Sequence, residues 1–281
     1  IHPVHTSYIL AVRIGKRYSS KVRGIATWFL VVIPHLMVYG TILYIAWIIN
    51  PLIWVIVAGW IIKLSISLRL LLSIIENIRK CAYQGNWDCI RFWTQQIVRR
   101  NVYSIDGEHV LSAAVESLAE SFVDGYTSPL FYTLFLGPIG ALLQRLANTL
   151  DGALGFKIPE YRNVGWFSAK VDTVLNYIPA RITAIIIIAL SPLARTSIGY
   201  TLRIWRHYHR ATESLNAGHP ISAMAGALMI RLEKIGVYTI GEKARDIDGD
   251  VIKIGLRITT IAAILWLSIL CIMLILLKNI P

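Results

Sequence analysis

The sequence predicts an all-α fold, a polytopic helical membrane protein with three to five membrane segments and cytoplasmic helical loops. Three observations predict it. The 281 residues are 56% hydrophobic and only 16% charged, whereas soluble domains carry about 25% charged residues. The mean hydropathy is +0.58. Finally, apolar runs long enough to cross a bilayer recur along the chain, and basic residues cluster beside them. We expect a single membrane-embedded domain over residues 1–281.

The strongest apolar runs predict a transmembrane hairpin over residues 24–76 and a C-terminal transmembrane helix over 257–278. Residues 25–49 are long enough to cross roughly 30 Å of hydrocarbon. The turn signal Asn50-Pro51 separates this run from a second one, residues 51–75. The last run is 258–277. Residues 77–256, between the hairpin and the last helix, form a cytoplasmic or re-entrant region.

Two apolar runs inside that region are weaker. Residues 127–147 are interrupted by Gly137-Pro138 and contain Arg145, and residues 178–194 are short and carry Arg181 in their first turn. Each either spans the bilayer or lies buried or re-entrant against other helices.

Basic residues predict the orientation. They precede the first span, follow the second and precede the last, which places the N-terminus in the cytoplasm. If residues 127–147 crossed, the segment that follows would lie outside, yet it carries Lys157, Arg162 and Lys170. We therefore favour the two weaker runs as buried, re-entrant, or a pair that returns to the same side. No basic n-region with a cleavable apolar core is visible near Ile1, so no secretory signal is expected.

The net charge of +12 is expected of basic loops beside anionic lipid. Nucleic-acid binding is disfavoured, because the basic residues are scattered between apolar runs and form no compact patch. Cys81, Cys89 and Cys271 are too few and too oddly spaced for a disulfide framework or a zinc knuckle. We expect inert thiols.

Glu116, Glu120 and Asp124 recur at four-residue spacing in front of an apolar run. Asp106 can cap a helix that runs to about Val123, with Gly125 as its stop. That helix has a buried stripe at helical spacing: Leu111, Val115, Leu118 and Phe122. The carboxylates would lie at the margin of this stripe, where pKa tuning and metal binding are both open.

The chain contains no P-loop, no dinucleotide fingerprint, no nucleophile elbow and no zinc-protease motif. A phosphate-handling protein of this kind must use separate basic side chains and Mg²⁺ held by carboxylates. Ionisable and amide residues gather between positions 116 and 181: Glu116, Glu120, Asp124, Asp151, Asp172, Arg145, Arg162, Lys170, Arg181, Asn148 and Asn176. Any one of these residues, taken alone, is as readily explained by a structural role. A whole cluster beside apolar runs is costly and favours a functional site.

A second stretch, "NAGHP" at 216–220, has the composition of a turn and precedes the small-residue run "SAMAGAL". That run suits close approach by another backbone or by a ligand. A lone histidine such as His219 is usually structural or solvated.

The motifs "HPV" at the start, "AAVESLAES", "SPLFY", "NTLD", "GW", "SAK" and "PAR" across 113–181, and "NAGHPISAMAGAL" at 216–228 together resemble the adenosylcobinamide-phosphate synthase family of cobalamin biosynthesis. The resemblance follows the chain in order over nearly its whole length. It implies a membrane-bound acid–amine ligase that joins adenosylcobyric acid to aminopropanol or (R)-1-aminopropan-2-ol O-phosphate, with ATP as a substrate and Mg²⁺ as cofactor.

The resemblance also implies roles for individual residues. Catalysis is assigned to Glu116, Glu120, Asp124 and Asp172, and Mg²⁺ ligation to Glu116, Glu120, Asp124, Asp151 and Asp172. Substrate and phosphate binding is assigned to Arg145, Asn148, Tyr161, Lys170, Asn176, Arg181, Asn216 and Gly218. Which carboxylate acts as the base stays open. Ser121, Thr173 and His219 depart from the usual family residues, an Asn, a second acid and a Trp. The Thr173 change could weaken a metal site built on adjacent carboxylates.

In the mechanism that we expect, a propionate of the corrinoid attacks the γ-phosphate of ATP, and the amine then displaces the phosphate. The expected partners are the corrinoid, aminopropanol phosphate, ATP and the lipid membrane, with no nucleic acid. A homo-oligomer or a complex with other cobalamin-assembly enzymes is left open.

Two other classes are weighed against the enzyme. A non-catalytic membrane sensor or accessory protein on the same scaffold would have a degraded acid and basic cluster, whereas this one is mostly intact. A transporter would place charges within the strong runs, which hold Lys63 and Arg69 but no acid at depth.

Overall fold

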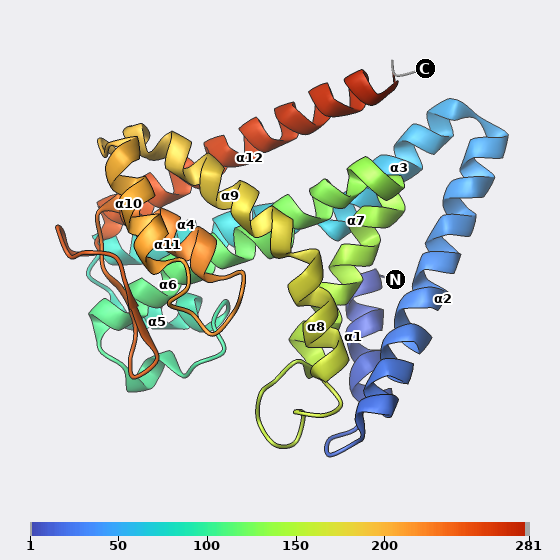
Figure 1. The fold of residues 1–281 in the computed structure, drawn as a ribbon, viewed down its shortest axis with the longest axis horizontal. Helices are drawn as coiled ribbons and strands as arrows, with labels where there is room; N and C mark the ends of the chain where they lie inside the picture. Colours follow the sequence, from blue (N-terminus) through green and yellow to red (C-terminus); the bar gives the residue numbers. More distant parts are fainter. Residues whose placement is uncertain (1, 279–281) are drawn as a thin grey trace. The chain divides into compact units, whose positions relative to one another are not determined.

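The structure is a computed structural model that describes residues 2–278. It divides into two compact units. Unit 1 comprises the chain up to Ile66, Ser128–Asn176 and the chain from Met273; unit 2 comprises Ser67–Thr127 and Tyr177–Ile272. The described residues are almost wholly helical (Figure 1), which confirms the all-α prediction.

Unit 1 contains a helical hairpin and the helices packed on it. The turn signal Asn50-Pro51 is confirmed, because the Asn50 side chain caps α3 by accepting a 2.7 Å hydrogen bond from the Leu52 N–H and Pro51 occupies the first turn. Fully buried residues of α2, α3 and α7, among them Val31, Ile61 and Leu146, form one core cluster. The helices of this unit are α1 (Pro3–Ile14), α2 (Lys21–Ile49), α3 (Pro51–Ser65), α7 (Ser128–Leu154) and α8 (Trp166–Leu175).

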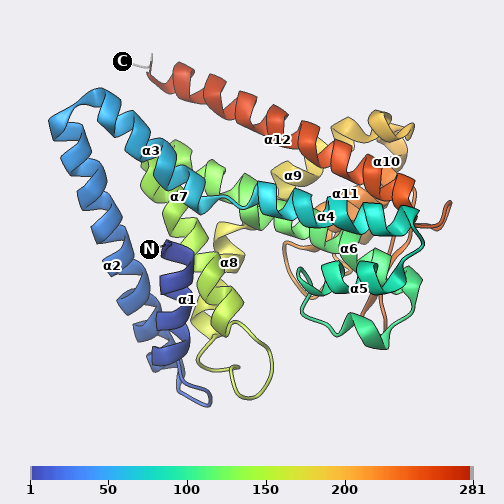
Figure 2. The ribbon, with the colours of Figure 1, turned by 180° about the vertical axis from the view of Figure 1, so that it is seen from behind.

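Unit 2 contains the remaining helices and a small antiparallel ribbon of two strands, in which Glu233 pairs with Thr239. Gly236 has a φ of 71°, which the tight turn of this ribbon requires. Figure 2 shows α4 running alongside α6. The elements are α4 (Leu68–Tyr83), α5 (Trp87–Gln95), α6 (Gly107–Phe122), α9 (Tyr177–Leu190), α10 (Ile198–Tyr208), α11 (Gly218–Leu228), β1 (Leu232–Lys234), β2 (Tyr238–Ile240) and most of α12 (Gly249–Lys278), with short η1 (Val102–Ser104), η2 (Val123–Thr127) and η3 (Ser191–Ala194).

The membrane segments agree in number with the prediction of three to five. Among residues 2–278, four helical stretches are long and apolar enough to cross a bilayer: Lys21–Ile49, Gly107–Leu154, Tyr177–Ala194 and Gly249–Leu276. A fifth arises if α3 and α4 are counted as one broken span. The second span expected over 51–75 is therefore present as a candidate, but its helix is broken between α3 and α4. The backbone of Ile66 is extended, and the Ser67 N–H donates to the Gly125 carbonyl instead of continuing a helix.

The predicted interruption at Gly137-Pro138 is confirmed. Gly137 has φ 58° and ψ −148°, so α7 consists of two helical parts that meet at a kink. Proline lacks the N–H that would otherwise bond across this point, and glycine tolerates the positive φ.

The predicted helix start at Asp106 is confirmed as well, since its side chain accepts the His109 N–H at 3.1 Å. The predicted stop at Gly125 is wrong, because the chain continues from α6 through a π-helical turn, Val123–Thr127, into α7. Gly125 instead allows Ser67 to approach the backbone closely. A Cβ there would lie 2.3 Å from Ser67 Oγ. The four residues of the predicted apolar stripe are all buried.

The expectation of inert thiols at Cys81 and Cys89 is also wrong, because the structure joins them in a disulfide. Helix α4 ends at Tyr83, Gly85 adopts a φ of 64°, and Asn86 caps α5. This tight reversal brings the two Cα atoms to 5.8 Å, a separation that a disulfide spans. Cys271 is free and exposed.

Candidate functional site

Glu116 lies in a buried hydrogen-bond network that joins α6 to the β1–β2 ribbon. The Tyr238 hydroxyl donates to Oε2 at 2.7 Å, and an Arg100 guanidinium N–H donates to the same oxygen at 3.1 Å. The Ser112 hydroxyl donates to Oε1 at 2.8 Å. Glu116 is only 6% exposed, deeper than the margin predicted for it. Both of its carboxylate oxygens are thus engaged by side chains of the same unit.

The Tyr238 hydroxyl is suited to remain a hydrogen-bond donor. Burial raises the pKa of its phenol, and the negative charge of Glu116 raises it further. Tyr238 therefore keeps its proton throughout the physiological pH range, and it cannot serve as a base here.

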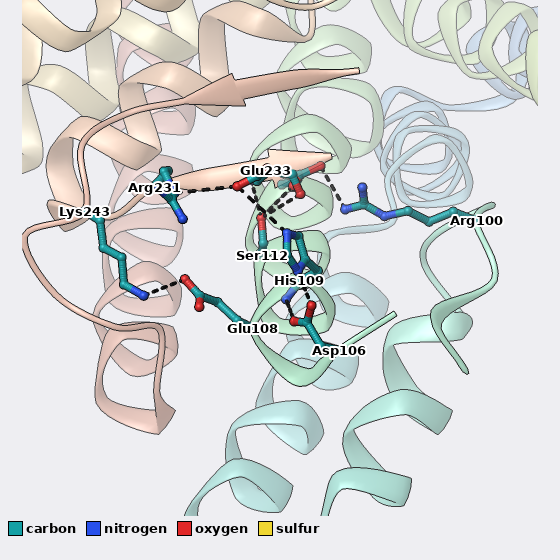
Figure 3. A network of polar contacts seen from close by, with 9 residues as sticks. Arg100, Asp106, Glu108, His109, Ser112, Arg231, Glu233 and Lys243 are labelled. Atoms are coloured by element: carbon teal, nitrogen blue, oxygen red, sulfur yellow. Dashed lines mark hydrogen bonds and ion pairs between the residues drawn. The ribbon is translucent and has the colours of Figure 1, made fainter. Parts of the chain in front are cut away.

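Figure 3 shows how this network continues over the face of α6 toward β1. The Ser112 hydroxyl accepts the Glu233 backbone N–H at 2.8 Å. The Glu233 carboxylate lies 3.6 Å from Arg231 and 3.9 Å from His109, and His109 Nδ1 is 2.7 Å from Asp106. These contacts fasten the ribbon to the first half of α6.

The other two carboxylates of the series lie further along the chain. Glu120 is exposed, one turn beyond Glu116, and Asp124 is half-buried in the π-helical turn. Because this turn is wider than an α-helical one, Asp124 does not continue the α-helical spacing.

Magnesium chemistry fits these residues only in part. Over residues 2–278, no three histidine, cysteine or acidic side chains gather closely enough to hold a metal ion. Mg²⁺, however, often rests on one or two carboxylates, with substrate phosphates and water completing its octahedron. The two carboxylate oxygens of Glu116 already accept hydrogen bonds from three protein donors. Glu120 and Asp124 stay candidates in unit 2.

A second polar cluster lies between α7 and α8 in unit 1, around Asp172. The Asn148 amide donates to Oδ1 at 3.2 Å, and the Asn176 amide donates to Oδ2 at 3.0 Å. Gln144 in turn donates to the Asn176 carbonyl oxygen at 3.2 Å. The structure thus brings together three residues that the resemblance singled out and fixes the orientation of the carboxylate.

Gln144 was missed by the sequence analysis. It is fully buried and precedes Asn148 by one helical turn on α7. The signal was available in the pattern, since a polar residue four positions before Asn148 shares its helix face.

The remaining candidates of unit 1 have different settings. Arg145 and Asp151 are half-buried on α7, and Lys170 is exposed on α8. The Tyr161 hydroxyl accepts a 3.2 Å hydrogen bond from Arg17. The pKa of His2, from the "HPV" motif, is lowered by burial and by the positive charge of Arg145.

In unit 2, Arg181 and the "NAGHP" stretch meet. An Arg181 guanidinium N–H donates to Asn216 Oδ1 at 3.3 Å and to the Tyr177 carbonyl at 2.5 Å. The guanidinium carbon lies 3.4 Å from the centre of the Tyr177 ring. Gly218 begins α11, where a Cβ would lie 2.2 Å from the His209 carbonyl oxygen. Only glycine fits there.

Comparison with known proteins places the chain in a family. The model of the family described as CobD/Cbib protein matches residues 1–274. The chain belongs to this family. No solved structure matches it.

Several CobD/Cbib relatives resemble the chain over most of its length. A probable cobalamin biosynthesis protein CobD of Aeropyrum pernix is 50% identical over 240 residues, which are 85% of this chain and 75% of the relative. A protein of the same description from Methanothermobacter thermautotrophicus is 34% identical over 211 residues, 75% of this chain and 71% of the relative. The cobalamin biosynthesis protein CobD of Clostridium perfringens is 33% identical over 267 residues, 90% and 85% of the two chains.

The family resemblance predicted from the motifs is therefore confirmed, and the chain is a CobD/Cbib protein of the cobalamin biosynthesis class with several candidate membrane-spanning helices. The individual site residues stay predictions. Hydrogen bonds gather some of them into the Glu116 network, the Asp172 cluster and the Arg181–Asn216 pair.

Proposed function

We propose that this CobD/Cbib chain is an adenosylcobinamide-phosphate synthase, a ligase that joins adenosylcobyric acid to (R)-1-aminopropan-2-ol O-phosphate or to aminopropanol. The observation that carries the proposal is the Asp172 cluster, where amides of Asn148 and Asn176 hold one carboxylate from both sides. The family resemblance implies a role for each of the three residues. An amide-forming enzyme can use a carboxylate held in this way as a base or as a metal ligand.

The chemistry requires activation, because a carboxylate oxygen is a poor leaving group. In the proposed reaction, an oxygen of the corrinoid propionate attacks the γ-phosphorus of ATP and ADP departs. The amine nitrogen then attacks the carbonyl carbon of the acyl phosphate, and inorganic phosphate departs. The amine proton passes to a carboxylate of the protein. Glu120, Asp124 and Asp172 are the candidates for this base.

Basic side chains would bind the phosphates. Arg145, Lys170 and Arg181 are the candidates, and arginine can present two N–H donors to one phosphate. Mg²⁺, held either by Glu120 and Asp124 of unit 2 or by Asp151 and Asp172 of unit 1, would neutralise phosphate charge. The engaged oxygens of Glu116 favour a positioning role for this residue over direct ligation.

The site is proposed to face the cytoplasm, because ATP is cytoplasmic and the basic residues flank the apolar runs on that side. A cysteine introduced at Lys157 tests this orientation. Labelling of that cysteine from outside intact cells by an impermeant maleimide would contradict it.

The function is tested with the purified, detergent-solubilised chain. It is incubated with adenosylcobyric acid, aminopropanol phosphate and Mg-ATP, and the corrinoid is followed by mass spectrometry. The proposal expects a mass gain of one linked aminopropanol phosphate that depends on ATP and is lost in Asp172→Ala. If the corrinoid binds but no product forms with any nucleotide tested, the chain is an accessory protein on the same scaffold.

A further inference from the structure

Two ring nitrogens of unit 2 are buried without a hydrogen-bond partner among the residues that the structure describes: His219 Nδ1 and Trp205 Nε1. His219 is only 6% exposed. Buried polar groups of folded proteins are nearly always hydrogen-bonded, so each exception indicates a missing partner such as a ligand or an ordered water.

The two nitrogens belong to one cluster of rings. The His219 ring centre lies 5.7 Å from that of Trp205 and 4.9 Å from that of His209, and the Trp205 and His209 rings stack at 5.3 Å. His209 Nδ1 lies 3.1 Å from the backbone carbonyls of Trp205 and Arg206. His209 is therefore tied to its own helix and acts as a wall of the cluster.

The cluster lies at the N-terminal turn of α11. His219 is the second residue of this eleven-residue helix, and Gly218 allows the turn to begin against the His209 carbonyl. The His219 N–H donates to the Asn216 carbonyl at 3.1 Å and the Ile221 N–H to the Ala217 carbonyl at 3.2 Å, so the attraction of this turn for anions comes from the helix dipole. Arg181, which bonds Asn216 just before the helix, adds a full positive charge that acts on His219.

The polar groups of Arg181, Trp205 and His219 are mainly hydrogen-bond donors. The indole N–H and the guanidinium can only donate, and a neutral imidazole carries one N–H. A ligand that satisfies them must present several acceptor oxygens, and a negative charge is favoured by the arginine and the helix terminus.

We propose that the side chains of Arg181, Trp205 and His219 form a recess at the first turn of α11 that binds the oxygens of a phosphoryl group. The choice of ligand rests on the proposed function, which offers two sources of such oxygens, the phosphorylated amine and ATP. Trp205 and His219 are new to the site, because no family motif used above includes Trp205 and His219 departs from the usual residue.

The test is equilibrium binding to the full-length, detergent-solubilised protein by isothermal titration calorimetry. The probes are inorganic phosphate, aminopropanol phosphate, unphosphorylated aminopropanol and ADP. Trp205→Phe removes one N–H and keeps an aromatic ring, so it should weaken phosphate binding roughly tenfold. Trp47→Phe is the matched control, because Trp47 is 62% exposed in α2, and its dissociation constants should equal those of the wild type.

Arg181→Gln is a second variant, in case Trp205→Phe melts at a lower temperature than the wild type. It should weaken binding of the phosphorylated probes and leave aminopropanol unaffected. If both variants weaken aminopropanol phosphate but not ADP, the recess holds the amine substrate; the reverse pattern assigns it to the nucleotide. Wild-type affinity for all phosphorylated probes in both folded variants would overturn the proposal, and a buried water would then satisfy the two nitrogens.

The binding result and the ligation result are separable. Phosphate binding that depends on Trp205, without any corrinoid product, would uphold the recess and reject the proposed function. Product formation with phosphate binding unchanged in both variants would uphold the function and reject the recess.

Discussion

The phenol of Tyr238 donates a 2.7 Å hydrogen bond to the carboxylate of Glu116, a residue 122 positions earlier in the chain. Tyr238 belongs to β2 and Glu116 to α6. A carboxylate that is buried to this depth is stable only when hydrogen bonds and a counter-charge replace water. The ribbon therefore supplies part of what keeps α6 in place, and the acid ties two distant segments together.

Tyr238→Phe should lower the free energy of unfolding by about 1–2 kcal/mol, because the buried carboxylate loses one of its donors while Arg100 and Ser112 remain. Thermal unfolding of the detergent-solubilised protein measures this. Tyr103→Phe is the control, since Tyr103 is 57% exposed. Equal melting temperatures for the two variants would show that the Tyr238 bond contributes no stability.

Asn176→Asp should disable the Asp172 cluster. The substitution keeps the shape of the side chain but replaces an amide donor, 3.0 Å from Asp172 Oδ2, with a second negative charge. We expect ligation to fall roughly tenfold to a hundredfold, since the carboxylate loses its orientation.

The matched control is Asn163→Asp, the same change at an exposed position of unit 1. It should keep wild-type activity. If Asn176→Asp ligates at the wild-type rate, Asp172 lies outside the chemistry.

His219 should make stability depend on pH below neutrality. Burial, followed by the positive charges of Arg181, His209 and Arg210, lowers the pKa of His219 to about 4 from its usual 6.5. Between these two values the unfolded chain binds a proton that the folded chain does not, so stability falls as the pH falls through this window. The loss approaches at most about 3 kcal/mol at pH 4.

The measurement is the melting temperature of the wild type and of His219→Gln from pH 7.5 to pH 5. The wild type should lose more stability over this range than the variant. Parallel curves would mean that His219 is protonated in the folded protein.

Gly218→Ala should destabilise the start of α11. The new methyl group would lie 2.2 Å from the His209 carbonyl oxygen, a backbone atom that cannot move aside alone. We expect a loss of about 1–3 kcal/mol and weaker phosphate binding. Gly199→Ala in α10 is the comparison, because a Cβ there meets nothing within 4 Å. An unchanged melting temperature for Gly218→Ala would show that the helix start is loosely packed.

Sequence patterns predicted the features that depend on neighbouring residues. The Asn50-Pro51 turn, the Asp106 cap and the Gly137-Pro138 kink each follow from a few adjacent side chains, and each is found in the structure. The ribbon at 232–240 also had a local signal, Gly236 among the β-favouring residues Ile235, Val237, Tyr238 and Thr239.

Features that depend on distant contacts were not predictable in this way. The helix does not stop at Gly125, because its carbonyl accepts the Ser67 N–H and its missing side chain makes room for Ser67. The partners of Glu116 come from α6, the segment before it and β2, so no spacing within the carboxylate series reveals them. The spacing of the three carboxylates therefore indicated important polar residues. It did not reveal that both carboxylate oxygens of Glu116 already accept hydrogen bonds.

The most direct test of the proposed ligase chemistry follows one oxygen atom of the corrinoid carboxylate into the products. Adenosylcobyric acid labelled with ¹⁸O in its propionate carboxylate is incubated with the purified chain, aminopropanol phosphate and Mg-ATP, and the products are resolved by mass. Activation by ATP predicts an amide-linked corrinoid together with one ¹⁸O in inorganic phosphate for each product formed. A cooperatively folded chain that yields no amide product, and no label in phosphate, would contradict the assignment as a ligase.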